Sequence, residues 1–236
     1  MFGTLRGLPR YVRDFRRFRA TYSGRLAIFP CLHDWSKEGG SASGEYFWQD
    51  LYVAQKINAA NPQKHVDIGS SVEGFVAHVA SFREIEVFDI RPITARVPGV
   101  TFKQADVMNL ATTSSDYCDS LSCLHALEHF GLGRYGDPID PKGYESGIRN
   151  MASLVRAGGV FYLSVPVGVE RVEFNAHRVF DPNTIVDVAK ENKLSLREFS
   201  VFSADSGLVE TDATYETLSA IGRRRYSLGI FTFVKT

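Results

Sequence analysis

The chain of 236 residues carries 27 basic and 27 acidic side chains and is 44% apolar, which predicts a globular protein with one domain, or one domain and an appended arm. No stretch approaches the roughly 18 uninterrupted apolar residues of a membrane span, and the N-terminus lacks the apolar core of a secretory signal. The cysteines at 31, 118 and 123 fit neither zinc nor disulfide spacing, so we expect reduced thiols in a cytoplasmic protein.

Basic charge is concentrated at the N-terminus. Residues 1–25 hold seven arginines and one acid, Asp14, a net +6, and the remaining 20 basic and 26 acidic residues give −6. Aromatic residues at 11, 15, 18 and 22 recur at helical spacing, and Pro9 marks the expected helix start. Such a helix over residues 5–25 suits the anionic inner face of a membrane or a partner, and the alternative is a helix docked on its own domain. Nucleic acid is not expected, because the rest of the chain is acidic. The oligomeric state is not predicted.

A loop separates this arm from the rest of the chain. Residues 26–44 are rich in Gly and Ser, so we expect an arm at 1–44 and a main domain at 45–236. A stripe of apolar side chains then predicts a helix that ends before Pro62. Gln49 and Asp50 are polar within this apolar run, which makes them candidates for contact with a substrate.

The main domain alternates between strand and helix patterns. Seven strands are expected, at 65–68, 85–90, within 99–107, at the start of 117–130, and at 160–167, 194–204 and 226–236. Helices are expected at 73–82, 144–159 and 181–193. The alternation predicts an α/β fold with a mostly parallel, doubly wound sheet, and the last two strands suit an antiparallel closing hairpin.

The first strand runs into the loop GSSVEG, residues 69–74. In doubly wound sheets, ligands bind beyond the carboxyl ends of the strands. This loop has the outer glycine spacing of a Walker loop, but Phe75 follows it in place of the phosphate-binding lysine. Ser71 replaces the second glycine of the dinucleotide fingerprint. A phosphate loop is therefore not expected, and a nicotinamide-dependent oxidoreductase is disfavoured.

Acids follow the first three strands. Asp89, at the end of the second strand, is placed to accept hydrogen bonds from both hydroxyls of a ribose. Asp106, after the third strand, is placed to accept from an adenine amine, or alternatively to cap the next helical turn. Asp67 is placed to bind the loop or a cofactor amino group, and its alternative is a simple turn acid.

This ordered set of acids, together with CLHALEHF and LVRAGGVFYLSVP, resembles the class I S-adenosylmethionine-dependent methyltransferases. The stretches GEYFWQDLYVAQKI, HVDIGSSVEGFVAHVASFREIEVFDIRP and HALEHFGLGRYGDPIDPKG resemble a methyltransferase-like family first catalogued as a nematode domain of unknown function. Bacterial members of that family are associated with surface-polysaccharide biosynthesis. The resemblance implies a Rossmann-like class I methyltransferase fold, with a mostly parallel seven-stranded sheet and an antiparallel last strand.

The same resemblance implies S-adenosylmethionine as cofactor and O-methyl transfer to a sugar or glycan hydroxyl, for example in O-antigen synthesis. The alternative is a non-catalytic module that organises polysaccharide assembly. The implied cofactor contacts are Asp67, Gly69, Ser70, Ser71, Asp89, Ile90, Asp106, Val107 and Leu124. Ser71 and Glu73 depart from the family pattern, which has more glycine at these positions, and Glu73 places a charge beside the loop.

Methyl transfer to a hydroxyl requires a base, and histidine is the usual base near neutral pH. His125 and His129 lie four residues apart around Glu128, and His177 follows the fifth strand. We expect His129 to be the base, with His125 and His177 as alternatives and Glu128 beside them. The non-catalytic interpretation is a capped turn that shapes the pocket.

The glycine- and proline-rich segment 131–141 predicts a structured loop or lid. The expected substrate contacts there are Arg134, Tyr135 and Asp137, with Arg178 further along the chain. The HExxH order of zinc proteases is absent, so no metal site is predicted. Magnesium or calcium bound through the acids of this loop is the alternative.

Overall fold

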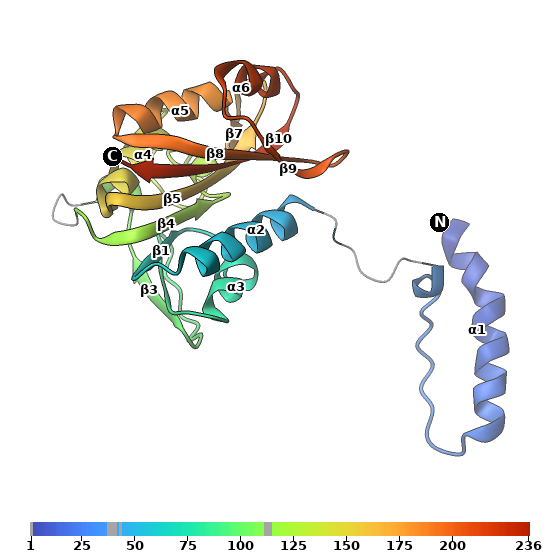
Figure 1. Cartoon of the computed structure of the whole chain (residues 1–236). Coiled ribbons are helices and arrows are strands. Elements are labelled where there is room, and N and C mark those ends of the chain that lie inside the picture. The colour runs from blue at the N-terminus through green and yellow to red at the C-terminus, as the bar shows by residue number, and fades with distance from the viewer. Residues whose placement is uncertain (1, 37–41, 43, 111–114) are drawn as a thin grey trace. The chain divides into compact units, whose positions relative to one another are not determined.

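The computed structural model describes residues 2–36, 42, 44–110 and 115–236. The chain forms two compact units, Met1–Ala42 and Ser43–Thr236, each described below by itself (Figure 1). Within the described residues, no helix has both the length and the apolar character needed to cross a membrane.

The first unit consists of helix α1 (Phe2–Thr21) and a segment that returns along it to a short 3₁₀ helix, η1 (Asp34–Ser36) (Figure 1). The expected helix start at Pro9 is wrong, because α1 begins at Phe2 and Pro9 lies inside it. Proline removes its own backbone hydrogen bond but leaves the turns before it free to form. The return segment lies close to Gly7, where an added Cβ would sit 2.0 Å from the carbonyl oxygen of Leu32.

The second unit contains an eight-stranded sheet in the order β3-β2-β1-β4-β5-β10-β8-β9. The strands are β1 (His65–Ile68), β2 (Ile85–Asp89), β3 (Val100–Gln104), β4 (Cys118–Leu124), β5 (Val155–Val167), β8 (Leu194–Ser203), β9 (Gly207–Thr211) and β10 (Ser227–Lys235). Strands β1 to β5 pair in parallel, whereas β10 runs antiparallel to both β5 and β8. The expected mostly parallel sheet with an antiparallel last strand is confirmed. The eighth strand, β9, arises because residues 207–211 fold back on β8.

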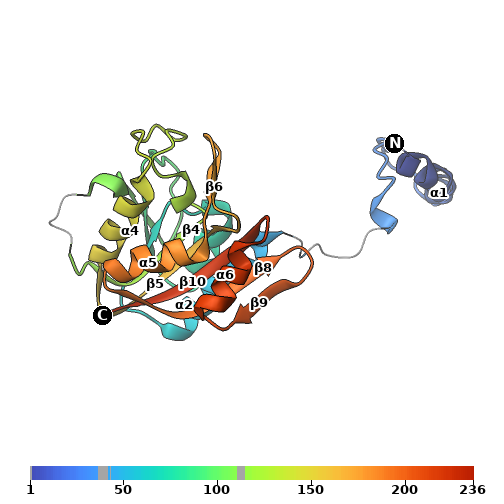
Figure 2. The same ribbon diagram turned by 90° about the horizontal axis from the view of Figure 1, so that it is seen from above.

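Helices cover both faces of this sheet (Figures 1 and 2). On one face lie α2 (Glu45–Ala60), the π-helical turn η2 (Val72–Val76) and α3 (Ala77–Ala80). On the other lie α4 (Gly143–Leu154), α5 (Pro182–Glu191) and α6 (Tyr215–Gly222). Each set of helices buries its own apolar core against the sheet, for example Ile57 and Phe75 on the first face, and Ile148 and Leu218 on the second.

Local signals explain the start of α5 and the end of α4. Asp181 caps α5 by accepting a hydrogen bond from Asn183 N (2.9 Å), and Pro182 occupies the first turn. Helix α4 ends at Leu154, earlier than expected, because the residues that follow pair with β4 as the start of β5. Two short strands were not predicted, β6 (Arg171–Glu173) and β7 (His177–Val179), which form a hairpin. The 3₁₀ turn η3 (Val107–Asn109) is the helical turn expected after Asp106 in the alternative interpretation of that acid.

Candidate active site

A cavity of about 780 Å³ opens beyond the carboxyl ends of β1, β2, β4 and β5. A narrower apolar slot adjoins it near the end of β3. One part, the carboxylate side, is lined by the strand-end loops and contains Gly69, Ser70, Ser71, Asp89, Ile90, Asp106, Val107 and Leu124. The other part, the histidine side, is lined by Glu45, Tyr46, His125, Glu128, His129 and Tyr226.

The loop after β1 is shaped from beneath by Asp67. Gly69 adopts φ +69°, a conformation that favours glycine, and its N–H donates to Phe88 O (2.9 Å). Asp67 is fully buried and accepts hydrogen bonds from Ser70 N (3.0 Å), Ser70 Oγ (2.6 Å) and Ser122 Oγ (2.5 Å). Burial raises the pKa of Asp67 to about 6. Asp67 therefore holds the turn and does not line the cavity.

A buried histidine, His65, contacts the serine that donates a hydrogen bond to Asp67. His65 Nε2 lies 3.1 Å from Ser122 Oγ, and its Nδ1 lies 2.8 Å from Ser120 Oγ. Because Ser122 donates to Asp67, its oxygen accepts from His65 Nε2–H, and Nδ1 then accepts from Ser120. Burial lowers the pKa of His65 to about 3, so the ring is neutral. Sequence analysis did not predict this series of hydrogen bonds, although the alternating serines Ser120 and Ser122 of β4 indicate polar side chains on one face of that strand.

Asp89 ends β2 with its carboxylate at the cavity wall, and it is 7% exposed. This carboxylate accepts three hydrogen bonds from Arg91, from its backbone N (2.8 Å), its Nε (3.0 Å) and its Nη2 (2.8 Å). The Arg91 guanidinium also lies 4.4 Å from the centre of the Tyr135 ring. Arg91 was not predicted, and it sits where a ligand of Asp89 would approach.

The slot has apolar walls and an acid at its edge. Ile90, Val107 and Phe130 line it together with Asp106. Asp106 Oδ1 accepts from Met108 N (3.0 Å) and so caps η3, as the alternative interpretation expected, while Asp106 also faces the slot. Glu73 is exposed and is not among the residues that line the slot or the cavity, so its charge lies away from both.

On the histidine side, 3₁₀ turn η4 (Leu127–His129) follows β4. His125 precedes it with φ +52°, an unusual conformation for a residue with a side chain. Its Nδ1 lies 2.8 Å from Glu128 Oε1 and its Nε2 3.6 Å from Glu45 Oε1, while its ring stacks on Tyr46 at 4.5 Å. Burial opposes the charged ring, but the hydrogen bond and charge of Glu128, aided by Glu45, outweigh it and raise the pKa of His125.

Tyr226, at the start of β10, completes this cluster by donating to Glu45 at 2.8 Å. Within the described residues, His125 Nε2 and Glu128 Oε2 are buried without a hydrogen-bond partner. Buried polar atoms in native proteins are normally paired. Both residues line the cavity, so the histidine side contains buried polar atoms that the described residues leave unpaired.

His129 Nε2 lies 3.8 Å from Glu128 Oε1, which is beyond hydrogen-bonding distance. Its Nδ1 lies 2.7 Å from Ala176 O, and because a carbonyl only accepts, Nδ1 carries the proton and Nε2 holds a lone pair. Burial lowers the pKa of His129, so the neutral ring is favoured. His177 also lines the cavity, but its Nε2 lies 3.4 Å from Glu173 Oε2.

The loop after η4 carries two further lining residues, Arg134 and Tyr135. Gly131 adopts φ +76°, and an added Cβ there would sit 1.9 Å from Asp140 O, so only glycine fits this close approach. Asp137 accepts from Gly133 N and Tyr135 N, both at 3.1 Å, which shapes the turn below Tyr135. Asp137 also lines the slot.

Solved structures share the fold of this chain. They include 1,6-didemethyltoxoflavin-N1-methyltransferase from Burkholderia thailandensis, solved with 1,6-didemethyltoxoflavin and S-adenosylhomocysteine (15% identity, 80% of this chain and 79% of that one, TM-score 0.52). The N-methyltransferase NodS from Bradyrhizobium japonicum, in complex with S-adenosylhomocysteine, matches at 13% identity over 82% and 89% of the chains, with a TM-score of 0.54. A TehB-like SAM-dependent methyltransferase from Corynebacterium glutamicum matches at 15% identity over 97% of both chains, with a TM-score of 0.54.

The chain has the class I methyltransferase fold. A family model described as "Caenorhabditis protein of unknown function, DUF268" matches residues 100–189. This methyltransferase-fold segment runs from β3 to α5 and includes the histidine turn η4. No curated protein matches the chain.

Three residues expected to contact a substrate lie elsewhere in the methyltransferase fold. Gln49 and Asp50 are buried, with Gln49 accepting from Ser164 Oγ and donating to Asp50 Oδ1 (2.9 Å). Arg178 is also buried and donates to backbone carbonyls, including Phe130 O (2.5 Å). None of the three is among the residues that line the cavity or slot, because each satisfies its polar groups inside the protein.

The described residues also include side chains typical of metal and thiol sites. Among these residues, no group of three or more His, Cys, Asp or Glu side chains is arranged to hold a metal ion. Cys118 and Cys123 are free thiols buried in the sheet, and Cys31 is an exposed free thiol in the first unit.

Proposed function

We propose that this chain is an S-adenosylmethionine-dependent methyltransferase that methylates a hydroxyl of a sugar or glycan. One observation carries the proposal: a strand-end carboxylate, Asp89, and a histidine with a free nitrogen, His129, line the same cavity of a class I methyltransferase fold. The proposed setting is surface-polysaccharide biosynthesis in the cytoplasm.

The carboxylate side fits the cofactor. Asp89 supplies two acceptor oxygens for ribose hydroxyls, and Asp106 supplies an acceptor beside the apolar walls of Ile90 and Val107, which suit a purine. Gly69 keeps the loop open, since an added Cβ would lie 3.1 Å from Ala126 Cβ. Two of the matching structures contain S-adenosylhomocysteine, which supports the same ligand here. When bound, S-adenosylmethionine supplies a methyl group on a sulfonium that leaves as a neutral thioether.

The histidine side supplies the base. A neutral hydroxyl is a weak nucleophile, so its proton must leave as the new carbon–oxygen bond forms. His129 Nε2 accepts that proton, while the Ala176 carbonyl holds Nδ1–H and fixes the ring. Glu128 Oε1, 3.8 Å from His129 Nε2, stabilises the imidazolium that results. Arg134 and Tyr135 of the neighbouring loop, with Glu45 and Tyr226, offer the hydrogen-bonding groups that a sugar requires.

Two observations support other functions. Two matching structures are N-methyltransferases, and the carboxylates Glu45 and Glu128 would attract a cationic amine, which favours N-methyl transfer as the second candidate. The Arg91 guanidinium donates hydrogen bonds to both oxygens of Asp89, the carboxylate that would bind a ribose. This favours a non-catalytic module with little affinity for a nucleoside.

Calorimetric titration with S-adenosylhomocysteine tests the cofactor. We expect micromolar affinity, about 8 kcal/mol, and no heat with NAD. Asp89→Ala should weaken binding about a hundredfold, because two charge-assisted hydrogen bonds to the ribose are lost, and Asp89→Asn should fall between. No binding by the wild type contradicts the proposal.

A second assay identifies the acceptor. Methyl transfer from S-adenosylmethionine to sugar hydroxyls and to amines is followed by mass spectrometry on matched acceptor panels. Methylated sugars support the proposal, and methylated amines alone replace it with N-methyl transfer. Cofactor binding without turnover on either panel supports the non-catalytic module.

A further inference from the structure

Taken by itself, the first unit leaves most of its large apolar side chains exposed. Among residues 7–36, only Gly7 is buried. Phe29 is 84% exposed, Ile28 69%, Phe18 55% and Trp35 53%. A segment of this length cannot close a hydrophobic core of its own, so these side chains gain from a covering surface.

The same unit is strongly basic. Residues 2–36 contain seven arginines and two acids, Asp14 and Asp34, a net +5. Asp14 pairs with Arg10 (3.4 Å) and Arg13 (3.0 Å), both on the exposed surface of α1. Surface pairs of this kind contribute little, so the unit keeps its attraction for an anionic surface.

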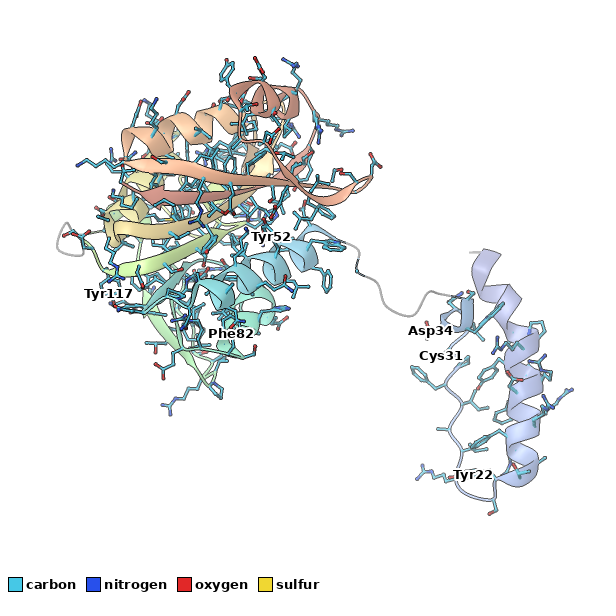
Figure 3. All side chains as sticks on the ribbon, viewed as in Figure 1. Tyr22, Cys31, Asp34, Tyr52, Phe82 and Tyr117 are labelled. Carbon is cyan, nitrogen blue, oxygen red and sulfur yellow. The ribbon has the colours of Figure 1, made fainter. Side chains whose placement is uncertain are left out.

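Basic and aromatic side chains form neighbouring stripes on α1. Arg10, Arg13 and Arg17 follow one another at i, i+3 and i+7, and the aromatic stripe at 11, 15, 18 and 22 runs beside them. Phe18 and Tyr22 contact each other at 5.1 Å, and Figure 3 shows Tyr22 where the return segment begins. Arg10 lies 5.0 Å from the ring of Trp35, which joins the stripe of arginines to η1.

We propose that the first unit docks on an anionic lipid surface. Lipid headgroups neutralise the arginines, and the interface beneath them accepts Phe29, Ile28 and Trp35. A second copy of the unit would bring two charges of +5 together, which disfavours self-association through this surface. Nucleic acid would use the arginines but would leave Ile28 and Phe29 uncovered. A lipid surface offers headgroups to the arginines and an apolar interface to Ile28 and Phe29, and this inference does not depend on the proposed activity.

Vesicle flotation with the full chain tests the proposal. One set of vesicles is phosphatidylcholine alone, and the other contains about 30% phosphatidylglycerol, which gives the negative surface potential that attracts basic segments. We expect the protein to float with the anionic vesicles and not with the neutral ones. Raising the salt concentration should weaken this binding, because the Debye length shortens.

Matched variants separate the contributions of charge and apolar side chains. The double substitution Arg13→Gln with Arg17→Gln should lower the partition coefficient about thirty-fold, and Phe29→Ser about ten-fold. The controls are Arg223→Gln with Arg224→Gln, and Tyr215→Ser, which change exposed side chains of the second unit. These controls should float like the wild type.

Three results would overturn the proposal: no flotation with either vesicle, equal flotation with both, or loss of binding in the controls as large as in the arm variants. Light scattering with the arginine variants distinguishes a protein partner from a lipid surface. A change of oligomeric state in those variants, without vesicle binding by the wild type, assigns the surface to a second copy instead.

Discussion

The two sides of the cavity differ in how far the chain satisfies its own polar groups. On the carboxylate side, Asp89 and Asp106 each accept hydrogen bonds from residues two positions along the chain, and Asp67 beneath that side accepts from Ser70. On the histidine side, His125 Nε2 and Glu128 Oε2 are buried without a partner in the described residues. A buried polar atom without a partner costs about 1–3 kcal/mol, so only the histidine side is left incomplete.

This difference predicts unequal responses to ligands. A nucleoside at Asp89 has to displace Arg91, so its net affinity is what remains after the exchange of one partner for another. A polar group that reaches Glu128 Oε2 displaces no hydrogen-bond partner, whereas one at His125 Nε2 competes only with the Glu45 carboxylate 3.6 Å away. The carboxylate side is therefore preformed and self-satisfied, and the histidine side is the part that a ligand stabilises.

The largest expected effect tests whether the histidine side is catalytic. His129→Gln removes the basic Nε2, so turnover should fall by about a hundredfold to ten-thousandfold, while S-adenosylhomocysteine affinity stays within about threefold. His177→Gln should cost far less, because the His177 ring is in contact with Glu173. If the His177 variant loses more turnover than the His129 variant, the assignment of the base is wrong.

The next effect tests the loop that carries the lining residues Arg134 and Tyr135. Gly131→Ala should lower the free energy of unfolding by at least about 3 kcal/mol, because it combines a left-handed conformation with a backbone collision at Asp140. Gly136→Ala is the matched control, since φ is +86° there and nothing lies within 4 Å of the added Cβ. Its cost should be only about 1 kcal/mol. Urea unfolding measures both, and equal losses would show that the Asp140 contact contributes nothing.

The smallest effect concerns the protonation of the histidine side. Glu128→Gln should lower the pKa of His125, measured by NMR of the imidazole ring, because the hydrogen bond to a carboxylate is lost. Glu45→Gln should lower it less, since Glu45 lies at 3.6 Å and Glu128 at 2.8 Å. A larger shift from Glu45→Gln would reverse the proposed order of the two carboxylates.

The pair of His125 and Glu128 makes the free energy of unfolding depend on pH. The folded-state pKa of His125 lies above that of the unfolded chain, so the pair stabilises the fold below the unfolded value of about 6.5. That contribution is lost as the pH rises through the folded-state pKa. Glu128→Gln should therefore cost about 1–2 kcal/mol more at pH 5.5 than at pH 9. A loss that does not change with pH would contradict the ion pair.

Sequence reasoning predicted the positions of Asp89 and Asp106 at the edge of the sheet, because the information for those positions is local. A strand pattern that ends in an acid fixes both the element and the edge of the sheet where that acid lies, as for Asp89. The parallel order of the strands then brings Asp89 and Asp106 to one slot. Arg91 was missed because its pairing with Asp89 follows from the shape of a turn, which residue types alone do not reveal.

The histidine side was predicted only in part. His125, Glu128 and His129 are close in sequence, but Glu45 and Tyr226 reach them from α2 and from the start of β10. Such contacts depend on how helices pack on the sheet, and no pattern in one sequence encodes them. Gln49 and Asp50 show the opposite error, because a polar residue in an apolar run can equally have a buried partner.

The outer strands of the sheet carry charge. Among the described residues, β3 and β9 form its two edges, and each edge presents backbone groups that another chain could pair with. Lys103 is exposed on β3 and Glu210 is exposed on β9. Charged side chains on edge strands disfavour the addition of a further strand and with it the growth of aggregates. The sheet is thus protected at both margins from continuing into a neighbouring molecule.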